Sequence, residues 1–304
     1  MQKSVSKPIV KALSPHLGGE ITGINLAKPL SIEVTRTIEA AIRQHKVLVF
    51  RNQQLNAAEL AQFGRHFGQL QAHVQKNYQD KEIPEVVWMT NRKDDGSFDE
   101  VGAARGSAKD TRDGWHSDMA FDPVPAKFTI LHALQIPSRG GNTCFSNTER
   151  VFELLSPTLQ RRLIGLKADF SYGGRASNAR NQLAANALSD ADKAASVAVH
   201  PVISTHPETG KPAVFISPYT TSGIRDLTSQ EAQNIFDEVY TVMDSAEVRW
   251  EHRWSVGDTV MWENRSGLMH SGRLDYPRDE ARIFIRTTVK GAPIKAYSLA
   301  NSFT

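Results

Sequence analysis

The chain has 304 residues, of which 40% are hydrophobic and 23% are charged, and its formal net charge is +3. This composition supplies enough apolar material for a folded core, and the balanced charge argues against a nucleic-acid-binding protein. The single cysteine, Cys144, excludes an intramolecular disulfide and a cysteine-rich metal site, so a metal would need histidine and carboxylate ligands.

Helical and strand patterns alternate in the first third of the chain. Apolar residues at helical spacing follow a capping signal at Ser31 and end in the buried, strand-like run VLVF at 47–50. A second helix is predicted within 56–70 and a strand at 85–91. The stretch 92–114 is polar, glycine-rich and unpatterned, and a loop of that length is often functional, for instance as an active-site lid.

Short β-like runs separated by turn signals dominate the rest of the chain, with helical patterns at 148–164 and 228–245. This mixture predicts an α+β, β-rich fold whose core is a double-stranded β-helix, or jelly-roll, with flanking helices. Without repeats or low-complexity linkers, residues 1–304 are expected to form one domain. No long apolar run occurs near the N-terminus, so the protein is expected to be cytoplasmic. The strand-like runs lie at 127–136, 142–147, 213–217, 258–264 and 282–290.

A histidine and an aspartate stand two positions apart in GWHSDMAF, residues 114–121. On a strand, His116 and Asp118 would point to one face and could bind one ion, although such a pair alone occurs by chance in many chains. A third candidate ligand, His270, lies far downstream. Two imidazoles and one carboxylate form the facial triad of non-haem Fe(II) oxygenases, which leaves three coordination positions open. The alternative interpretation of these residues is a structural polar cluster.

Five ordered segments resemble the taurine dioxygenase/2,4-D dioxygenase (TauD/TfdA-like) family of Fe(II)- and 2-oxoglutarate-dependent dioxygenases. WHSDMAF carries the family's HxD motif, and GGNT matches its GG-x-T signature. The resemblance covers nearly the whole chain and implies a single TauD/TfdA-like dioxygenase domain. The segments are LGGEITGINLAKPLS, KVLVFRNQQLNAAELAQFGRHFGQL, WHSDMAF, PAKFTILHALQIPSRGGNTCFSN and GDTVMWENRSGLMHSGRLDYPRDEARIFIRTTVKG.

The resemblance implies roles for the residues that match the family's metal and cosubstrate sites. His116, Asp118 and His270 would hold Fe(II). Thr143 and Arg282 would bind the distal carboxylate of the cosubstrate 2-oxoglutarate, because an arginine fork matches a carboxylate in a bidentate manner. The keto acid's other end would chelate the iron and leave one position for O2.

A second set of residues is assigned to the substrate by the same resemblance. Arg286 matches an arginine that holds the substrate's anionic group, while Tyr219, His73 and Tyr172 lie where family members line the substrate pocket. The taurine enzyme is expected to have an asparagine near the position of Arg112, and this chain departs from that pattern. Taurine is therefore not predicted as the substrate.

The implied reaction hydroxylates a small anionic organic molecule and releases succinate and CO2 from 2-oxoglutarate. Hydroxylation at a carbon that bears a heteroatom would lead to bond cleavage, and Asp118 argues against halogenation, since halogenases have a small residue there. A catalytically silent jelly-roll binding protein is the alternative, and a zinc hydrolase, which would have no use for Arg282, is a third hypothesis. No nucleic-acid or membrane partner is expected, and assembly into a homodimer or homotetramer is left open.

Overall fold

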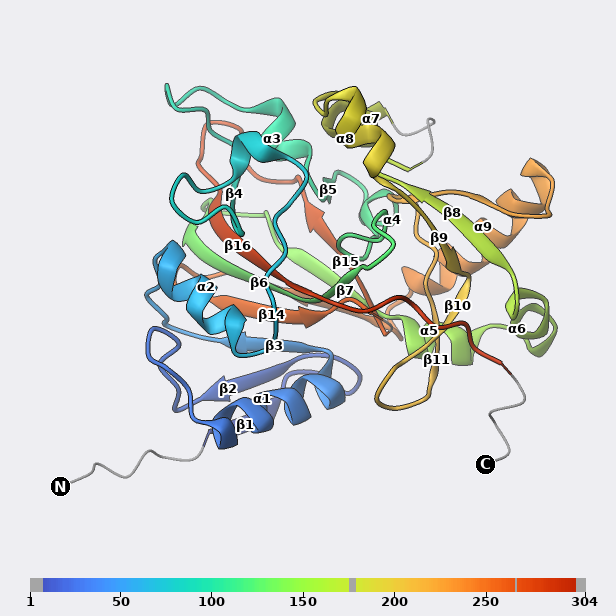
Figure 1. The fold of residues 1–304 in the computed structure, drawn as a ribbon, viewed down its shortest axis with the longest axis horizontal. Helices are drawn as coiled ribbons and strands as arrows, with labels where there is room; N and C mark the ends of the chain where they lie inside the picture. The colour runs from blue at the N-terminus through green and yellow to red at the C-terminus, as the bar shows by residue number, and fades with distance from the viewer. Residues whose placement is uncertain (1–7, 175–178, 266, 299–304) are drawn as a thin grey trace.

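A seven-stranded sheet forms the centre of the protein, as the computed structural model of residues 8–174, 179–265 and 267–298 shows (Figure 1). Its strands pair antiparallel except for one parallel pair near the N-terminal edge. In spatial order the strands are β1 (Ile9–Ala12), β2 (Gly19–Thr22), β3 (Val47–Phe50), β14 (Thr259–Glu263), β6 (Ala126–Gln135), β16 (Ile283–Lys290) and β4 (Val86–Thr90).

Three smaller sheets complete the β structure. The four-stranded sheet consists, in spatial order, of β13 (Arg249–His252), β7 (Thr143–Asn147), β15 (Leu268–Arg273) and β5 (Ser107–Ala108). The three-stranded sheet consists of β12 (Thr221–Ile224), β8 (Lys167–Ser171) and β9 (Val197–Pro201). The two-stranded sheet pairs β10 (Ile203–Thr205) with β11 (Pro212–Val214).

The helices begin where the sequence supplies caps. Ser31 caps the first long helix, and Asn56 and Thr228 each form a capping box with a glutamate three residues later. Within the described residues, no helix combines the length and the apolar character that crossing a membrane would require. The helices are α1 (Ile32–His45), α2 (Ala57–Arg65), the 3₁₀ turn η1 (Lys76–Tyr78), α3 (Glu100–Ala104), α4 (Thr111–Gly114), α5 (Thr148–Leu154), α6 (Pro157–Leu163), α7 (Ala179–Asn186), α8 (Asp190–Ala195) and α9 (Ser229–Met243).

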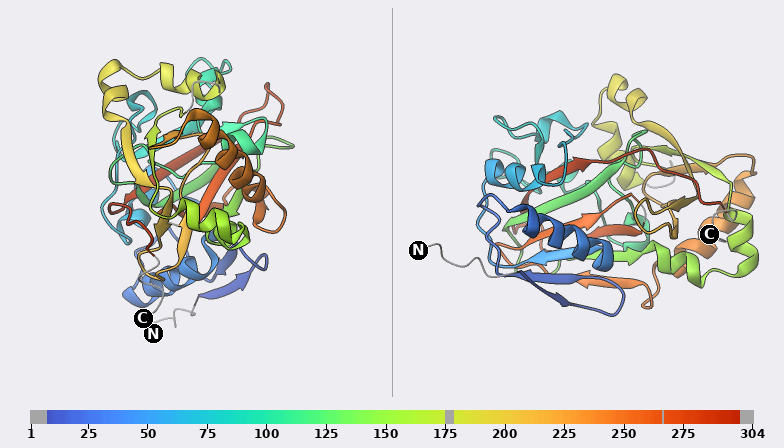
Figure 2. Two further views of the ribbon diagram at one scale, coloured as in Figure 1. Left: turned by 90° about the vertical axis from the view of Figure 1, so that its right-hand side faces the viewer. Right: turned by 60° about the horizontal axis from the view of Figure 1, so that its bottom comes forward.

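Apolar residues of the large sheet alternate between two separate cores. Val260 and Trp262 of β14 pack with Phe145 of β7 and Leu268 of β15, in a core between the large and the four-stranded sheets. Met261, between them in sequence, packs on the opposite face with residues of α1 and α2. The right-hand view of Figure 2 shows α1 lying along this face. The period of two along each strand therefore decides which side chains enter the space between the sheets.

The outer face of the four-stranded sheet packs against α5 and α9, and α6 contributes residues to the same apolar core. Figure 1 shows α6 farther out, at the right-hand edge of the molecule. Cys144 of β7 and Met269 of β15 pack there with Phe236 and Val239 of α9. Cys144 thus points away from the face of its neighbour Thr143, as the strand pattern predicts, and is fully buried.

Three predicted elements differ from the structure. The helix predicted at 148–164 is divided into α5 and α6, because Pro157 cannot continue a helix but fits the first turn of a new one after the cap Ser156. The strand predicted at 213–217 ends at Val214, and the backbone N–H of Ser217 donates instead to the Thr221 hydroxyl. The unpatterned stretch 92–114 contains α3, β5 and α4.

Candidate functional site

His116 and His270 are joined through their backbones. Each donates its N–H to the carbonyl of the other, at 3.0 Å from His116 and 2.9 Å from His270, and this isolated bridge attaches the HxD segment to β15. The ring centroids consequently lie 4.1 Å apart. Asp118 follows in a turn rather than on a strand, and Met119 after it adopts a φ of +58°, which is unusual for a non-glycine residue.

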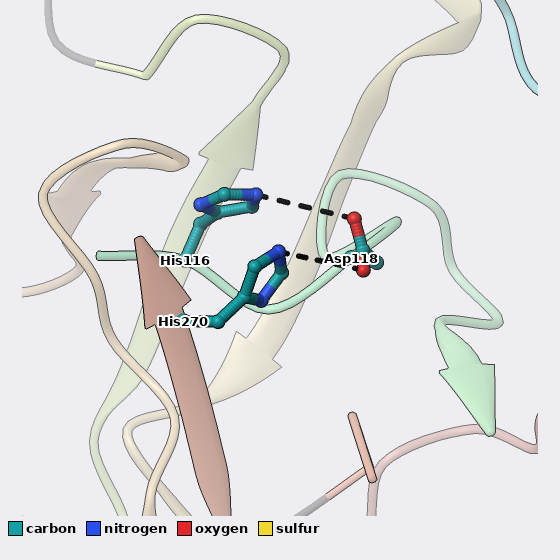
Figure 3. Close-up of side chains that lie close together, drawn as sticks. All are labelled: His116, Asp118 and His270. Carbon is teal, nitrogen blue, oxygen red and sulfur yellow. Dashed lines mark ion pairs between the residues drawn. The ribbon is translucent and has the colours of Figure 1, made fainter. Parts of the chain in front are cut away.

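The three predicted metal ligands converge. Nε2 of His116 lies 3.9 Å from Oδ1 of Asp118, and Nε2 of His270 lies 3.6 Å from Oδ2. Figure 3 shows both imidazole rings directed at the carboxylate. All three residues are buried, and one ligand atom from each lies within 4.8 Å of the others. In the described part of the chain this is the only cluster of three potential metal ligands with such geometry.

The protonation states of these groups suit a metal ion. Nδ1 of His116 lies 2.7 Å from the Gly114 carbonyl, so it donates there and leaves the lone pair of Nε2 for a ligand. Burial lowers the pKa of His116. Burial and the nearby His116 together lower the pKa of His270 to about 3. Burial is the largest single effect on Asp118 and raises its pKa, but the Arg286 guanidinium, the two histidines and the Thr129 hydrogen bond together hold the pKa of that carboxyl well below its usual range. Neutral imidazoles and an ionised carboxylate are the forms that bind metals.

Asp118 is oriented by a network that sequence reasoning missed. Thr129 of β6 donates its hydroxyl to Oδ2 at 2.6 Å and accepts from the Asn264 amide at 2.9 Å. Asn264 also accepts the backbone N–H of Asp118 at 3.1 Å. Thr129 shares strand parity with Leu131, which faces the space between the sheets. The position of Thr129 in the strand therefore predicts that its side chain points toward the space between the sheets, but no motif marks Thr129 or Asn264.

One cavity between the sheets brings together all of the site residues that the sequence predicts. Its walls also include the apolar side chains Met89, Leu131, Phe121 and Trp262. The predicted residues that line it are His73, His116, Asp118, Thr143, Tyr172, Tyr219, His270, Arg282 and Arg286.

Thr143 and Arg282 form one part of this lining. Thr143 accepts a hydrogen bond from Nε1 of Trp254 at 3.0 Å, which leaves its hydroxyl hydrogen for another acceptor. The Arg282 guanidinium lies 4.3 Å from the Phe284 ring and donates from Nε to the Gly141 carbonyl at 3.1 Å. Among the described residues no carboxylate forms an ion pair with Arg282. The pair can therefore receive an external carboxylate.

Arg286 and its neighbours form another part of the lining. Nη1 of Arg286 donates to Oδ1 of Asp118 at 2.9 Å, while its Nε is buried with no hydrogen-bond partner among the described residues. The Tyr219 ring lies 4.8 Å from the His116 ring. His73 accepts from the backbone of Gln75 at 3.1 Å, and burial lowers its pKa well below the usual range, so it is neutral.

Arg105 also lines the cavity, and the sequence interpretation did not select it. It lies between α3 and β5, in the stretch 92–114 where the sequence shows no pattern. Its side chain is buried, although no spacing or motif in the sequence distinguishes it from the less buried arginines nearby.

Comparisons with known proteins identify relatives over most of the chain. The family model described as "Taurine catabolism dioxygenase TauD, TfdA family" matches residues 9–288. The α-ketoglutarate-dependent 2,4-dichlorophenoxyacetate dioxygenase of Cupriavidus pinatubonensis is 30% identical, over 87% of this chain and 92% of the relative. The alkylsulfatase of Acinetobacter baylyi is also 30% identical, over 93% and 84%. The crystal structure of a taurine dioxygenase from Burkholderia xenovorans has the same fold, with a TM-score of 0.75 at 24% identity, covering 95% of this chain and 93% of that one.

Proposed function

Because the chain belongs to the TauD/TfdA family of α-ketoglutarate-dependent dioxygenases, we propose that it is an Fe(II) enzyme that hydroxylates a small anionic organic molecule. 2-Oxoglutarate, which is α-ketoglutarate, would be converted to succinate and CO2 in the same reaction. The observation that carries this proposal is the convergence of His116, Asp118 and His270 within 4.8 Å at a shared cavity. A hydroxylated carbon that bears a heteroatom would then lose it by bond cleavage.

The donor set fits iron. Two neutral imidazole nitrogens and one carboxylate oxygen occupy one face of an octahedral ion and leave three positions open. Bound iron would supply the activation of O2 that couples loss of CO2 from 2-oxoglutarate to oxidation of a C–H bond. The protein's part is to keep both histidines neutral, to hold Asp118 through Thr129, and to exclude bulk water with apolar walls.

Thr143 and Arg282 would bind the distal carboxylate of 2-oxoglutarate. The planar Arg282 fork pairs with two carboxylate oxygens, and the Thr143 hydroxyl, already an acceptor for Trp254, donates its hydrogen. Since no carboxylate among the described residues forms an ion pair with Arg282, the distal carboxylate of the cosubstrate would be its ion-pair partner.

Arg286 would hold the anionic group of the prime substrate, with His73, Tyr172 and Tyr219 shaping the pocket. The names of the relatives support this, because 2,4-dichlorophenoxyacetate is a carboxylate and alkyl sulfates carry a sulfate group. The lowered pKa of His73 makes it a neutral hydrogen-bonding group, so the arginines supply the attraction for an anion.

We also infer that residues 1–304 form one domain with a jelly-roll core. The packing of the large sheet on the four-stranded sheet, with one shared apolar core between them, supports this assignment.

The proposal is tested by anaerobic titration of the purified protein with Fe(II) and 2-oxoglutarate. Chelation of the keto acid by iron gives a weak visible charge-transfer band, and subsequent O2 releases succinate. Arg282→Ala is expected to weaken 2-oxoglutarate by about 1.5–3 kcal/mol, or roughly ten- to 150-fold in Kd, since a hydrogen-bonded charge is lost. Arg278→Ala, in the exposed turn before Arg282, is the matched control and is expected to change neither band nor Kd.

Other results would contradict the proposal in distinct ways. Bound iron without the band would remove the cosubstrate assignment and favour a metal site of another kind. A normal band without succinate release, with any of the anionic substrates tried, would indicate a catalytically silent binding protein.

A further inference from the structure

Arg105 is held rigidly at the cavity wall. It is 3% exposed, its Nη2 donates to the Trp88 carbonyl of β4, and its guanidinium lies 3.6 Å from the centre of the Tyr78 ring. Two glycines fix the segment on either side. A Cβ on Gly102 would lie 2.2 Å from the Thr90 carbonyl oxygen, and one on Gly106 would lie 3.2 Å from Nε2 of His116. The Arg105 backbone is therefore set between β4 and a metal-site histidine.

The Arg105 guanidinium lacks the partners that a buried charge requires. Its Nε and Nη1 are buried without a hydrogen-bond partner, and no carboxylate within the described ranges forms an ion pair with it. Asp99, an acid in the same segment, is already engaged by the Tyr78 hydroxyl at 2.7 Å and by the N–H of Gly102 at 2.9 Å. Leaving such donors unpaired away from water is costly.

Other buried cations of the protein are neutralised by neighbours. Nζ of Lys46 lies 2.6 Å from Glu149, and Nε of Arg265 lies 2.7 Å from Glu263. Buried cations outside the cavity are thus paired with carboxylates of the protein itself. Burial lowers the pKa of Arg105 only to about 10, so it remains charged at neutral pH. Arg105 is among the residues that line the cavity, and a ligand anion bound there is the partner that would satisfy its two unpaired donors.

The charge of the cavity lining indicates how many negative charges that ligand carries. Three guanidinium groups, those of Arg105, Arg282 and Arg286, oppose the single carboxylate of Asp118. The histidines that would bind the metal do so as neutral imidazoles, and burial keeps His73 neutral by lowering its pKa. A divalent ion and dianionic 2-oxoglutarate add no net charge when both bind. An excess of two positive charges remains for the prime substrate.

We propose that Arg105 is a second anion-binding residue of the active site and that the prime substrate is a dianion, with one anionic group at Arg286 and the other at Arg105. This inference rests on the proposed function. A sulfonate or sulfate ester that also carries a carboxylate, or a dicarboxylate, has the required chemistry. Both guanidinium charges act on the same part of the cavity, because after burial they are the two largest causes that lower the pKa of His73.

The test compares dianions with monoanions of equal length. Affinities of 3-sulfopropanoate, 4-sulfobutanoate and 5-sulfopentanoate are measured anaerobically by calorimetry on the Fe(II)- and 2-oxoglutarate-loaded protein. Propane-, butane- and pentane-1-sulfonate are the paired monoanions. For at least one chain length, the dianion is expected to bind at least about tenfold more tightly than the paired monoanion, because a charge-assisted hydrogen bond is added.

Substitutions of Arg105 test whether this residue causes the preference for dianions over monoanions. Arg105→Met is expected to reduce the preference to about twofold or less, with the visible band unchanged. Arg105→Gln, which keeps a donor for the Trp88 carbonyl, serves the same purpose if the methionine variant does not fold. Arg105→Lys should retain part of the preference. Arg112→Met is the control, because Arg112 belongs to the same segment but pairs with Asp237 on the surface.

Three results would overturn the inference. One is equal binding of dianion and monoanion at every length by the wild-type protein, and another is an undiminished preference in both neutral variants. In either case a normal visible band shows that the proposed function itself stands. Absence of the band in the wild-type protein would instead refute the proposed function, and this inference with it.

Discussion

Asp118 receives a hydrogen bond on each carboxylate oxygen, from Thr129 on one and from Arg286 on the other. The two bonds leave limited freedom for the carboxylate to rotate, and they fix which lone pairs point toward the two histidines. Groups of this kind, which orient a ligand without touching the metal, commonly change metal affinity by ten- to 100-fold when removed.

Thr129→Val is therefore expected to weaken metal binding by about ten- to 100-fold. The substitution keeps the shape of the side chain but removes the 2.6 Å hydrogen bond to Oδ2 and the acceptor for Asn264. Titration of the metal-free protein with Fe(II) or Mn(II) measures the effect.

Thr287→Val is the matched control for that substitution. Thr287 is equally buried in the adjacent strand β16, but its hydroxyl donates to the Glu85 carbonyl on the other face of the sheet. Both variants should lose similar stability, and only Thr129→Val should lose metal affinity. Equal metal affinity in the two variants would contradict a role for Thr129 in orienting Asp118.

The segment from α3 to β5 shows how tertiary contacts determine structure that local pattern does not. The helix α3 has five residues and β5 has two, so neither completes enough of its period to give a hydrophobic pattern. What defines α3 is the Asp99 cap and the close approach of Gly102 to the backbone of β4. Residues of this segment nevertheless reach the cavity. Arg105 was not predicted because no local sequence pattern marks the segment.

Gly102→Ala is expected to destabilise the protein by about 1–3 kcal/mol, the usual cost of overpacking a well-packed site. The new methyl group would lie 2.2 Å from the Thr90 carbonyl oxygen, so α3 must move away from β4 and carry Arg105 with it. Denaturant unfolding measures the stability. Affinity for dianions should fall more than affinity for 2-oxoglutarate.

Gly223→Ala provides the comparison, because a Cβ at Gly223 meets no atom within 4 Å. It is expected to change stability by less than about 0.5 kcal/mol, the range of an ordinary surface substitution. A similar loss in both glycine variants would indicate that contact between α3 and β4 is not the cause.

Burial of histidines affects the molecule as a whole. Burial lowers the pKa of His132, His200, His206 and His252, all of which lie outside the candidate site. In the unfolded chain these groups titrate near pH 6.5, so the unfolded state takes up protons first as the pH falls. The stability they contribute is complete above about pH 6.5 and is lost as the pH falls toward the lowered folded-state values.

Thermal unfolding between pH 7.5 and 5.5, in the presence of a chelator, should therefore show a falling Tm. Each such histidine lowers the free energy of unfolding by up to about 1.4 kcal/mol per pH unit. His200→Gln is expected to reduce this slope, whereas replacement of the exposed His16 with glutamine should not. A Tm that is constant over this range would contradict the prediction.

The strands and the two ligands of the HxD motif have a signal that is local in sequence, whereas His270 was assigned through the family resemblance. The runs that became β6, β7, β14 and β16 are long enough to show apolar character and turn boundaries, and HxD is a motif within three residues. The supporting network of Asp118 could not be predicted, because threonine and asparagine are common in every environment. The proline break between α5 and α6 was visible in the sequence but was outweighed there by the helical pattern.

Asp118 and Arg286 lie 168 positions apart in the sequence, and His270 comes from a third segment of the fold. An unfolded chain does not hold these groups together, so an ion bound by the triad would select the native state by mass action. At an ion concentration a hundredfold above its Kd, the gain in unfolding free energy is about 2.7 kcal/mol. Metal supply would then govern the lifetime and abundance of the protein as well as its turnover, since the metal-free chain would unfold, and be degraded, more readily.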